Sequence, residues 1–126
     1  MHTVYVTYSG YNCEAVLQVM ETLVRMGYGI MCECMLPYCA DTEEQAHRHI
    51  RQADAVVAVI TEDAADCSYM ARDLAWAREA NAKILPVVVG DAVLPTGLTC
   101  ECTISDFPTV EEINAFAERL HLLMEA

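Results

Sequence analysis

The sequence is poor in basic residues, with seven Lys and Arg against nineteen Asp and Glu and a formal net charge of −12. A surface with this balance repels phosphate backbones and anionic lipid headgroups. We therefore expect the chain to bind neither nucleic acid nor membranes.

Long hydrophobic runs are also missing. The longest apolar segments, 55–60 and 84–89, have the length of a β-strand and are far too short to span a bilayer. No basic segment followed by a long apolar stretch stands near Met1, so the sequence predicts no secretory signal. We expect a cytoplasmic location.

The cysteine pattern does not indicate a metal site or a disulfide framework. Seven cysteines are an odd number, and in a cytoplasmic chain reduced thiols are the simpler interpretation. The pairs Cys32/Cys34 and Cys100/Cys102 have C-x-C spacing, whereas most structural zinc sites use C-x-x-C. We expect no metal.

The sequence lacks the motifs of three common nucleotide and phosphate chemistries. The turn at 9–12, SGYN, has neither the G-x-G-x-x-G nor the G-x-x-x-x-G-K-[ST] spacing, which argues against dinucleotide redox and P-loop chemistry. Residues 8–12 contain no acid, so the acidic cluster of a phosphoacceptor domain is absent. The four histidines form no H-x-x-x-H pair.

What is present is an alternation of strand-like and helix-like segments along residues 1–126, which predicts a single domain. The expected strands are 3–8, 28–33, 54–60, 84–89 and 103–104, and capping-box patterns at 41–45 and 109–112 open two of the helices. Parallel strands need such crossovers, so we predict an α/β fold: a flavodoxin-like, doubly wound, five-stranded parallel sheet with helices on both faces. Pro86 fits only where its backbone lacks a ladder partner.

The third expected helix carries the clearest candidate chemistry. Tyr69 and Asp73 are four residues apart and so share a face, while Met70, Leu74 and Ala77 form the opposite stripe, which would pack on the sheet. An acid beside an aromatic ring at the carboxyl ends of the strands could hold a ribose and stabilise an oxocarbenium-like centre. The spacing alone also fits an exposed aspartate near an exposed tyrosine.

Several segments match a known pattern in order and spacing. They are 4–9 (VYVTYS), 26–28 (MGY), 36–41 (LPYCAD), 50–60 (IRQADAVVAVI), 75–77 (AWA), 83–87 (KILPV) and 106–107 (DF). Together they resemble the Toll/interleukin-1 receptor (TIR) domain family, of bacterial type, across nearly the whole chain. The resemblance implies the same fold, and a proline at position 86 is expected there.

The resemblance implies two kinds of function. Many TIR domains are adhesive modules, and others cleave NAD⁺ at the nicotinamide–ribose bond with a glutamate in the motif Ser-x-Trp-Cys-x-x-Glu-Leu. Here the motif positions hold Cys67, Tyr69, Met70 and Asp73 in place of Ser, Trp, Cys and Glu. Aspartate reaches about 1.5 Å less than glutamate, and a misplacement of ~1 Å can cost ~100-fold in rate.

Our leading hypothesis is therefore a signalling domain that assembles with other TIR domains or with itself, with weak or absent NAD⁺ cleavage. Its interaction loop by resemblance contains Leu36, Pro37, Tyr38 and Cys39. The main alternative is an NAD⁺ glycohydrolase or cyclase, with NAD⁺ as substrate and no cofactor. Asp73 would be catalytic there, Tyr69 would stack near the nicotinamide, and Tyr8, Ser9 and Tyr38 would line the site. A nucleotide-binding sensor of related fold is the third possibility.

Overall fold

The computed structural model describes residues 2–8, 14–33, 41–62, 67–99 and 102–126. The strands are β1 (Thr3–Tyr8), β2 (Gly29–Met31), β3 (Ala55–Ile60), β4 (Lys83–Val89) and β5 (Cys102–Ile104). The helices are α1 (Glu14–Arg25), α2 (Thr42–Gln52), α3 (Ser68–Glu79) and α4 (Val110–Glu125). All strand pairs are parallel, in the order β2-β1-β3-β4-β5. The predicted five-stranded parallel sheet is confirmed.

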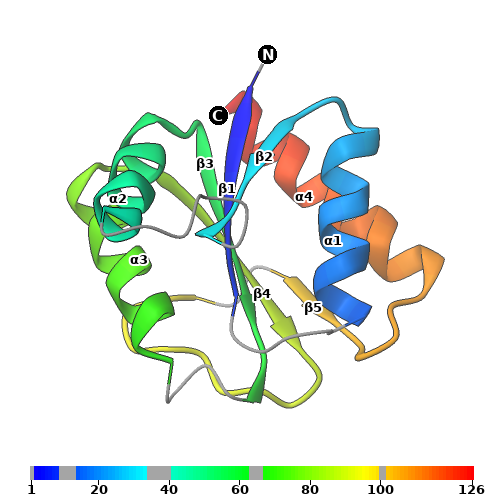
Figure 1. Cartoon of the computed structure of the whole chain (residues 1–126). Coiled ribbons are helices and arrows are strands. Elements are labelled where there is room, and N and C mark those ends of the chain that lie inside the picture. Colours follow the sequence, from blue (N-terminus) through cyan, green and yellow to red (C-terminus); the bar gives the residue numbers. More distant parts are fainter. Residues whose placement is uncertain (1, 9–13, 34–40, 63–66, 100–101) are drawn as a thin grey trace.

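The helices cover both faces of the sheet, with α1 and α4 on one side and α2 and α3 on the other (Figure 1). Alternate residues of a strand point to opposite faces. Accordingly, Val4 and Val6 belong to the apolar cluster that includes Phe116 of α4. Tyr5 belongs to the cluster that includes Ile50 of α2.

Strand lengths follow their place in the sheet. Central β3 is buried at all six positions, as its continuous apolar run predicts for a strand covered on both faces. Edge strand β2 is shorter than the expected 28–33, because its pairing with β1 runs from Gly29 to Met31. The chain enters β2 through Gly27, whose φ of 86° is open to glycine.

Pro86 lies within β4, opposite Ala58 of β3. On the other side of β4, the described pairing with β5 begins one residue later, at Val87. The proline therefore stands at the start of that ladder, where a missing N–H is tolerated best.

The two capping-box predictions have different outcomes. At α4, Thr109 Oγ1 accepts from the Glu112 N–H at 3.2 Å, and the Glu112 carboxylate accepts from the Thr109 N–H at 2.9 Å, as predicted. At α2, Asp41 makes no side-chain capping bond, because its ψ of 18° departs from the extended conformation that the cap requires. None of the described helices is both long and apolar enough to cross a membrane.

Candidate functional site

Asp73 lies in α3 on the side that packs against the sheet, and the residue is 2% exposed. It stands three residues after Met70 and one before Leu74, so it belongs to the buried stripe of the helix rather than to its outer face. The helix begins after Cys67, whose Sγ accepts from the Met70 N–H at 3.4 Å. Asp73 is thus fixed by the packing of the whole helix.

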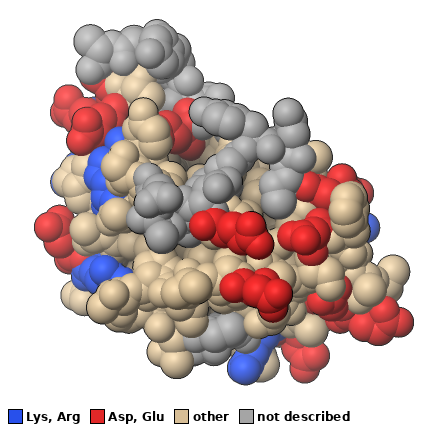
Figure 2. Space-filling view, turned by 90° about the horizontal axis from the view of Figure 1, so that it is seen from below, with Lys and Arg blue, Asp and Glu red and all other residues tan. Residues whose placement is uncertain are grey.

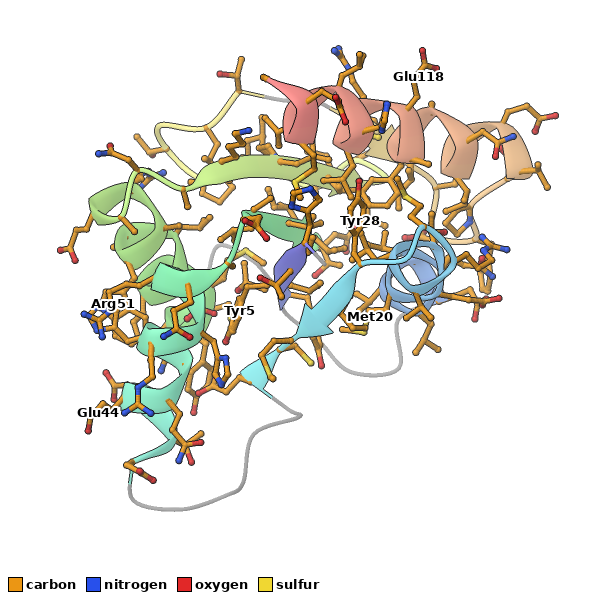
Figure 3. The ribbon with its side chains drawn as sticks, turned by 90° about the horizontal axis from the view of Figure 1, so that it is seen from above. Tyr5, Met20, Tyr28, Glu44, Arg51 and Glu118 are labelled. Carbon is orange, nitrogen blue, oxygen red and sulfur yellow. The ribbon has the colours of Figure 1, made fainter. Side chains whose placement is uncertain are left out.

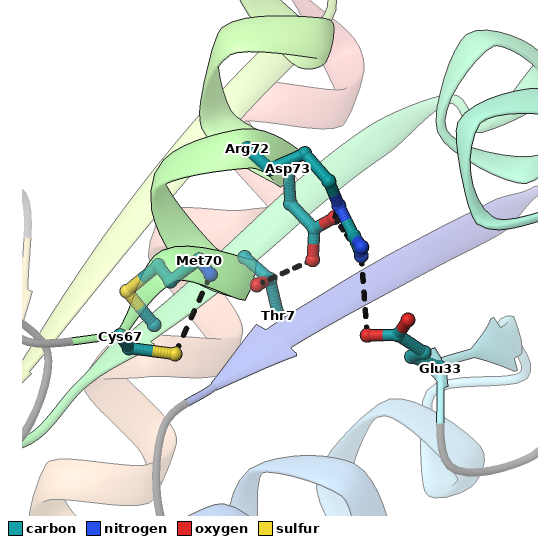
Figure 4. A network of polar contacts seen from close by, with 6 residues as sticks. All are labelled: Thr7, Glu33, Cys67, Met70, Arg72 and Asp73. Atoms are coloured by element: carbon teal, nitrogen blue, oxygen red, sulfur yellow. Dashed lines mark hydrogen bonds and ion pairs between the residues drawn. The ribbon is translucent and has the colours of Figure 1, made fainter. Parts of the chain in front are cut away.

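Both carboxylate oxygens of Asp73 are engaged by protein groups (Figure 4). Oδ2 accepts from the Thr7 hydroxyl at 2.9 Å. Oδ1 accepts from Arg72 Nη2 at 3.0 Å and from Arg72 Nε at 3.3 Å. Arg72 Nη2 also donates to Glu33 Oε2 at 3.1 Å, so one guanidinium joins two carboxylates.

The burial of this network and the bonds within it shift the pKa values of Asp73 and Arg72. Burial raises the pKa of Asp73, and the hydrogen bonds from Thr7 and Arg72 offset that rise in part. Burial acts to lower the pKa of Arg72, but its bonds to Asp73 and the charge of Glu33 outweigh it and raise the pKa. The guanidinium stays charged and holds the two acids together.

Tyr5 lies beside this network without joining it. Its side chain is 1% exposed, and among the described residues its hydroxyl is the buried side-chain oxygen with no hydrogen-bond partner. Burial and the nearby charges of Asp73 and Glu33 raise the pKa of Tyr5 far above its ordinary value. Figure 3 shows Tyr5 between the sheet and the helices α2 and α3.

Arg72 is also held between aromatic rings. Its guanidinium carbon lies 5.2 Å from the centre of the Tyr69 ring and 4.7 Å from that of Trp76. Trp76 stacks in turn on His47 of α2, with 4.4 Å between ring centres and 14° between planes. These contacts restrict Arg72 to one orientation, toward Asp73 and Glu33.

The residues predicted to share a site are separated by the structure. Asp73 points into the interior, whereas Tyr69 is 58% exposed and contacts Arg72. Tyr8 packs against the apolar cluster under α1 and α4, on the sheet face opposite Asp73. Ser9 and the interaction loop (Leu36, Pro37, Tyr38 and Cys39) lie outside the described residues.

Sequence reasoning missed the partners of Asp73. One signal was available, because positions 70, 73, 74 and 77 follow the i, i+3, i+4, i+7 spacing of a buried helix face. Thr7 likewise stands two residues after Tyr5 and shares its sheet face. The pairing of Arg72 with Glu33 spans 39 residues and had no local signal.

The carboxyl edge of the sheet, where ligands of such folds bind, is acidic. Each of four strands is followed within two residues by an acid: Glu33, Glu62, Asp91 and Asp106. The sequence places no Lys or Arg in the connections that leave this edge, 9–13, 32–41, 61–67, 90–101 and 105–109. Viewed from this end, most of the charged side chains on the described surface are acidic (Figure 2). The connections themselves therefore offer no basic side chain to a phosphate.

The described residues contain no group of three or more His, Cys, Asp or Glu side chains placed to hold a metal ion. The Glu33–Arg72–Asp73 group supplies two acids, both bonded to the guanidinium.

Comparison with known proteins identifies the fold. The TIR domain of the Toll-related receptor TRR-2 from Hydra magnipapillata is similar at a TM-score of 0.75 and 15% identity, covering 98% of both chains. The TIR domains of the activated Roq1 resistosome, which directly recognises the pathogen effector XopQ, are similar at a TM-score of 0.63 and 12% identity, covering 99% of this chain and 84% of that one. No family model and no curated protein sequence matches the chain. The chain has the TIR fold; its bacterial type stays a prediction.

Proposed function

We propose that this chain is a TIR-type signalling domain that works by homotypic protein assembly, with weak or absent NAD⁺ cleavage. The observation that carries the proposal is the state of Asp73. Its carboxylate is 2% exposed and accepts three hydrogen bonds from Thr7 and Arg72. Both oxygens of this carboxylate are already hydrogen-bonded to protein groups, and it would have to break the network to move toward a ribose or a developing positive charge.

The charge of the carboxyl edge supports the same conclusion. NAD⁺ carries a pyrophosphate, and sites for such ligands use basic side chains or glycine-rich helix N-termini. The edge presents Glu62, Asp91 and Asp106 as exposed acids, and the connections there contain no Lys or Arg. An anionic dinucleotide would meet repulsion on approach.

The assembly part of the proposal rests on likeness and on surface chemistry. One structural neighbour is the TIR portion of a resistosome. In this chain, Val110 is the first residue of α4 and Phe107 lies three residues before it, and they are 72% and 79% exposed. Large apolar side chains exposed together are typical of protein contact surfaces.

An NAD⁺ turnover assay on the wild type, Asp73→Glu and Asp73→Ala tests the proposal, at low and high protein concentration. We expect no saturable nicotinamide release from the wild type above the Asp73→Ala background. Robust release by the wild type that Asp73→Ala abolishes would contradict the proposal and favour the NAD⁺ glycohydrolase. A gain of activity in Asp73→Glu alone would identify the natural chain as a degenerate enzyme.

Thermal-shift measurements with NAD⁺, ADP-ribose and nucleosides test the nucleotide sensor. We expect no ligand to raise the midpoint of thermal unfolding. A ligand that bound only the folded state would stabilise that state and raise the midpoint. Sedimentation over a range of concentrations tests assembly. A chain that remains monomeric throughout would contradict the adhesive role.

A further inference from the structure

The most exposed apolar side chains of the domain stand at one end of the sheet. Among the described residues, Phe107, Val93 and Val110 are 79%, 78% and 72% exposed, whereas the other large apolar side chains reach at most 58%. Phe107 lies between β5 and α4, Val110 is the first residue of α4, and Val93 belongs to the connection that follows β4. The Gly90 N–H donates to the Ile104 carbonyl at 2.8 Å, so the connections after β4 and β5 leave the sheet side by side (Figure 1).

The fold does not use Phe107 or Val110 in its core. The helix α4 packs on the sheet through Ile113, Phe116 and Leu120, and its capping box is made by residues that come after Phe107. A phenyl ring left in water is favourably removed from it by contact with another apolar surface. Phenylalanine is for this reason enriched at protein interfaces.

The two apolar side chains are accompanied by acids. Asp106 precedes Phe107 and Glu111 follows Val110, and both acids are exposed. Asp91, also exposed, stands on the neighbouring connection, where a β-carbon added to the glycine before it would lie 3.8 Å from Asp106 Oδ1. None of these three carboxylates forms an ion pair with a described residue. We call the two apolar residues and the three acids the exposed corner.

The basic side chains nearest to the exposed corner do not neutralise it. Arg119 is exposed on α4, but it stands eight residues beyond Glu111, about 12 Å further along the helix axis. Arg78 reaches the connection after β4 at Thr96, whose carbonyl accepts from its Nη2 at 3.1 Å. The acids of the corner therefore have no counter-charge among the described residues around them.

This combination defines the chemistry of a partner. We propose that the exposed corner binds an amphipathic segment of a different protein, in which apolar side chains are flanked by Lys or Arg. The apolar side chains of that segment cover Phe107 and Val110, and its basic side chains meet Asp91, Asp106 and Glu111. Opposite charges on the two surfaces select the partner and speed its association.

A second copy of this chain fits the exposed corner less well. It carries a net charge of −12, so the corner and most of another chain's surface repel each other. Arg48 and Arg51 share α2 with two exposed glutamates. On α1, Arg25 stands beside Val24, which is 58% exposed, and this pair is the contact between copies that an experiment has to exclude.

The proposal goes beyond homotypic assembly, because it gives the domain a partner of opposite charge at a surface separate from the contact between copies. It is tested by fluorescence anisotropy with the whole chain and a labelled amphipathic helical peptide of Leu and Lys. Two matched peptides carry Glu in place of Lys or Ser in place of Leu. We expect the Leu/Lys peptide to bind saturably and roughly tenfold more tightly than either control. Equal binding of the Leu/Lys and Ser/Lys peptides would overturn the proposal, since charge alone would then explain it.

Paired variants locate the binding surface through its apolar part. Phe107→Ser/Val110→Ser should weaken binding of the Leu/Lys peptide roughly tenfold. The matched control is Leu17→Ser/Val24→Ser, which removes two apolar side chains of α1 that are 55% and 58% exposed. All four positions are exposed, and circular dichroism verifies that both variants fold. Equal weakening in the two variants would contradict binding at the corner.

A second pair of variants tests the acids. Asp106→Asn/Glu111→Gln should weaken binding and reduce its dependence on salt concentration, because close charge pairs are lost. Glu43→Gln/Glu44→Gln changes the net charge equally by removing two exposed acids of α2. If both variants bind the peptide alike, the effect belongs to the net charge and the proposal fails.

Sedimentation of the same proteins separates this proposal from the proposed function. A chain that binds the Leu/Lys peptide at the corner but never self-associates would refute the adhesive role and support the basic partner. A chain that self-associates but binds no peptide would leave the adhesive role standing and overturn the basic partner. Self-association that Phe107→Ser/Val110→Ser abolishes would also overturn it, because the corner would then be a contact between copies.

Discussion

On strand β1, Val4 and Val6 face α1 and α4, whereas Tyr5 and Thr7 face α2 and α3. The first face is a continuous apolar cluster. The second holds the only buried charged side chain of the described residues, Asp73, with its partners Thr7 and Arg72. One strand thus borders two interiors of different chemistry.

The comparison shows where stability and candidate chemistry reside. Apolar burial on the α1/α4 face contributes roughly 25 cal/mol per Å² and needs no specific geometry. On the α2/α3 face, a buried acid is tolerated because its bonds are complete, and losing one partner would leave it uncompensated. The following changes test that contrast.

Arg72→Met should have the largest effect. The substitution keeps much of the side-chain volume but leaves Asp73 buried without its counter-ion, and we expect the free energy of unfolding to fall by roughly 3 kcal/mol. Urea denaturation followed by circular dichroism measures it. Combining it with Asp73→Asn should recover part of the loss, because a neutral amide needs no counter-ion.

Arg25→Met is the control for that change. Arg25 is exposed and donates to the Thr22 hydroxyl at 3.2 Å, so we expect a loss within about 0.5 kcal/mol. Similar losses at Arg25 and Arg72 would mean that the polar face does not differ energetically from an ordinary helix surface.

The pH dependence of the free energy of unfolding, compared between the wild type and Asp73→Asn, tests the buried acid directly. Burial holds the pKa of Asp73 above its ordinary value, so the folded chain takes up this proton at a higher pH than the unfolded chain. The contribution of Asp73 to stability is then full below the unfolded pKa and is lost as the pH rises through the folded pKa. The wild type should gain stability relative to Asp73→Asn as the pH falls from about 7 toward about 4.

The difference in stability between the two proteins removes the contributions of the other titrating groups, which both proteins share. Asp54 and Glu112 have lowered pKa values through backbone hydrogen bonds, and their contributions change with the opposite sign. Urea midpoints of both proteins across this range give the measurement. Parallel pH profiles would show that Asp73 has the same pKa in the folded and unfolded chains.

Among the changes on the α2/α3 face, Tyr69→Ala should have the smallest effect. The ring is 58% exposed, and its contact with the Arg72 guanidinium contributes about 0.5–1 kcal/mol at such a site. Urea denaturation measures the loss in the free energy of unfolding. A loss as large as that of Arg72→Met would indicate that the exposed ring, and not the carboxylates, holds Arg72 in place.

The fold could be predicted because its signals are local. The apolar run of β3, the helical stripe of Met70, Leu74 and Ala77 and the capping box of Thr109 each depend on neighbours a few residues away. The polar network could not, because Glu33, Arg72 and Thr7 come together only when β1, α3 and the end of β2 are assembled. Tyr69 and Asp73 share a helix, but packing on the sheet turned one outward and the other inward.

The alternation along β1 has a consequence for how the sheet finds its alignment. An apolar strand between two buried layers could slip by one residue against β3 and still bury hydrophobic side chains on both faces. In β1, such a slip would carry Tyr5 and Thr7 under α1 and α4 and leave Asp73 facing Val6 or Tyr8. The polar residues therefore disfavour the shifted alignment. The bond between Thr7 and Asp73, which are 66 residues apart in the sequence, favours the alignment that pairs Val4 with Ala55.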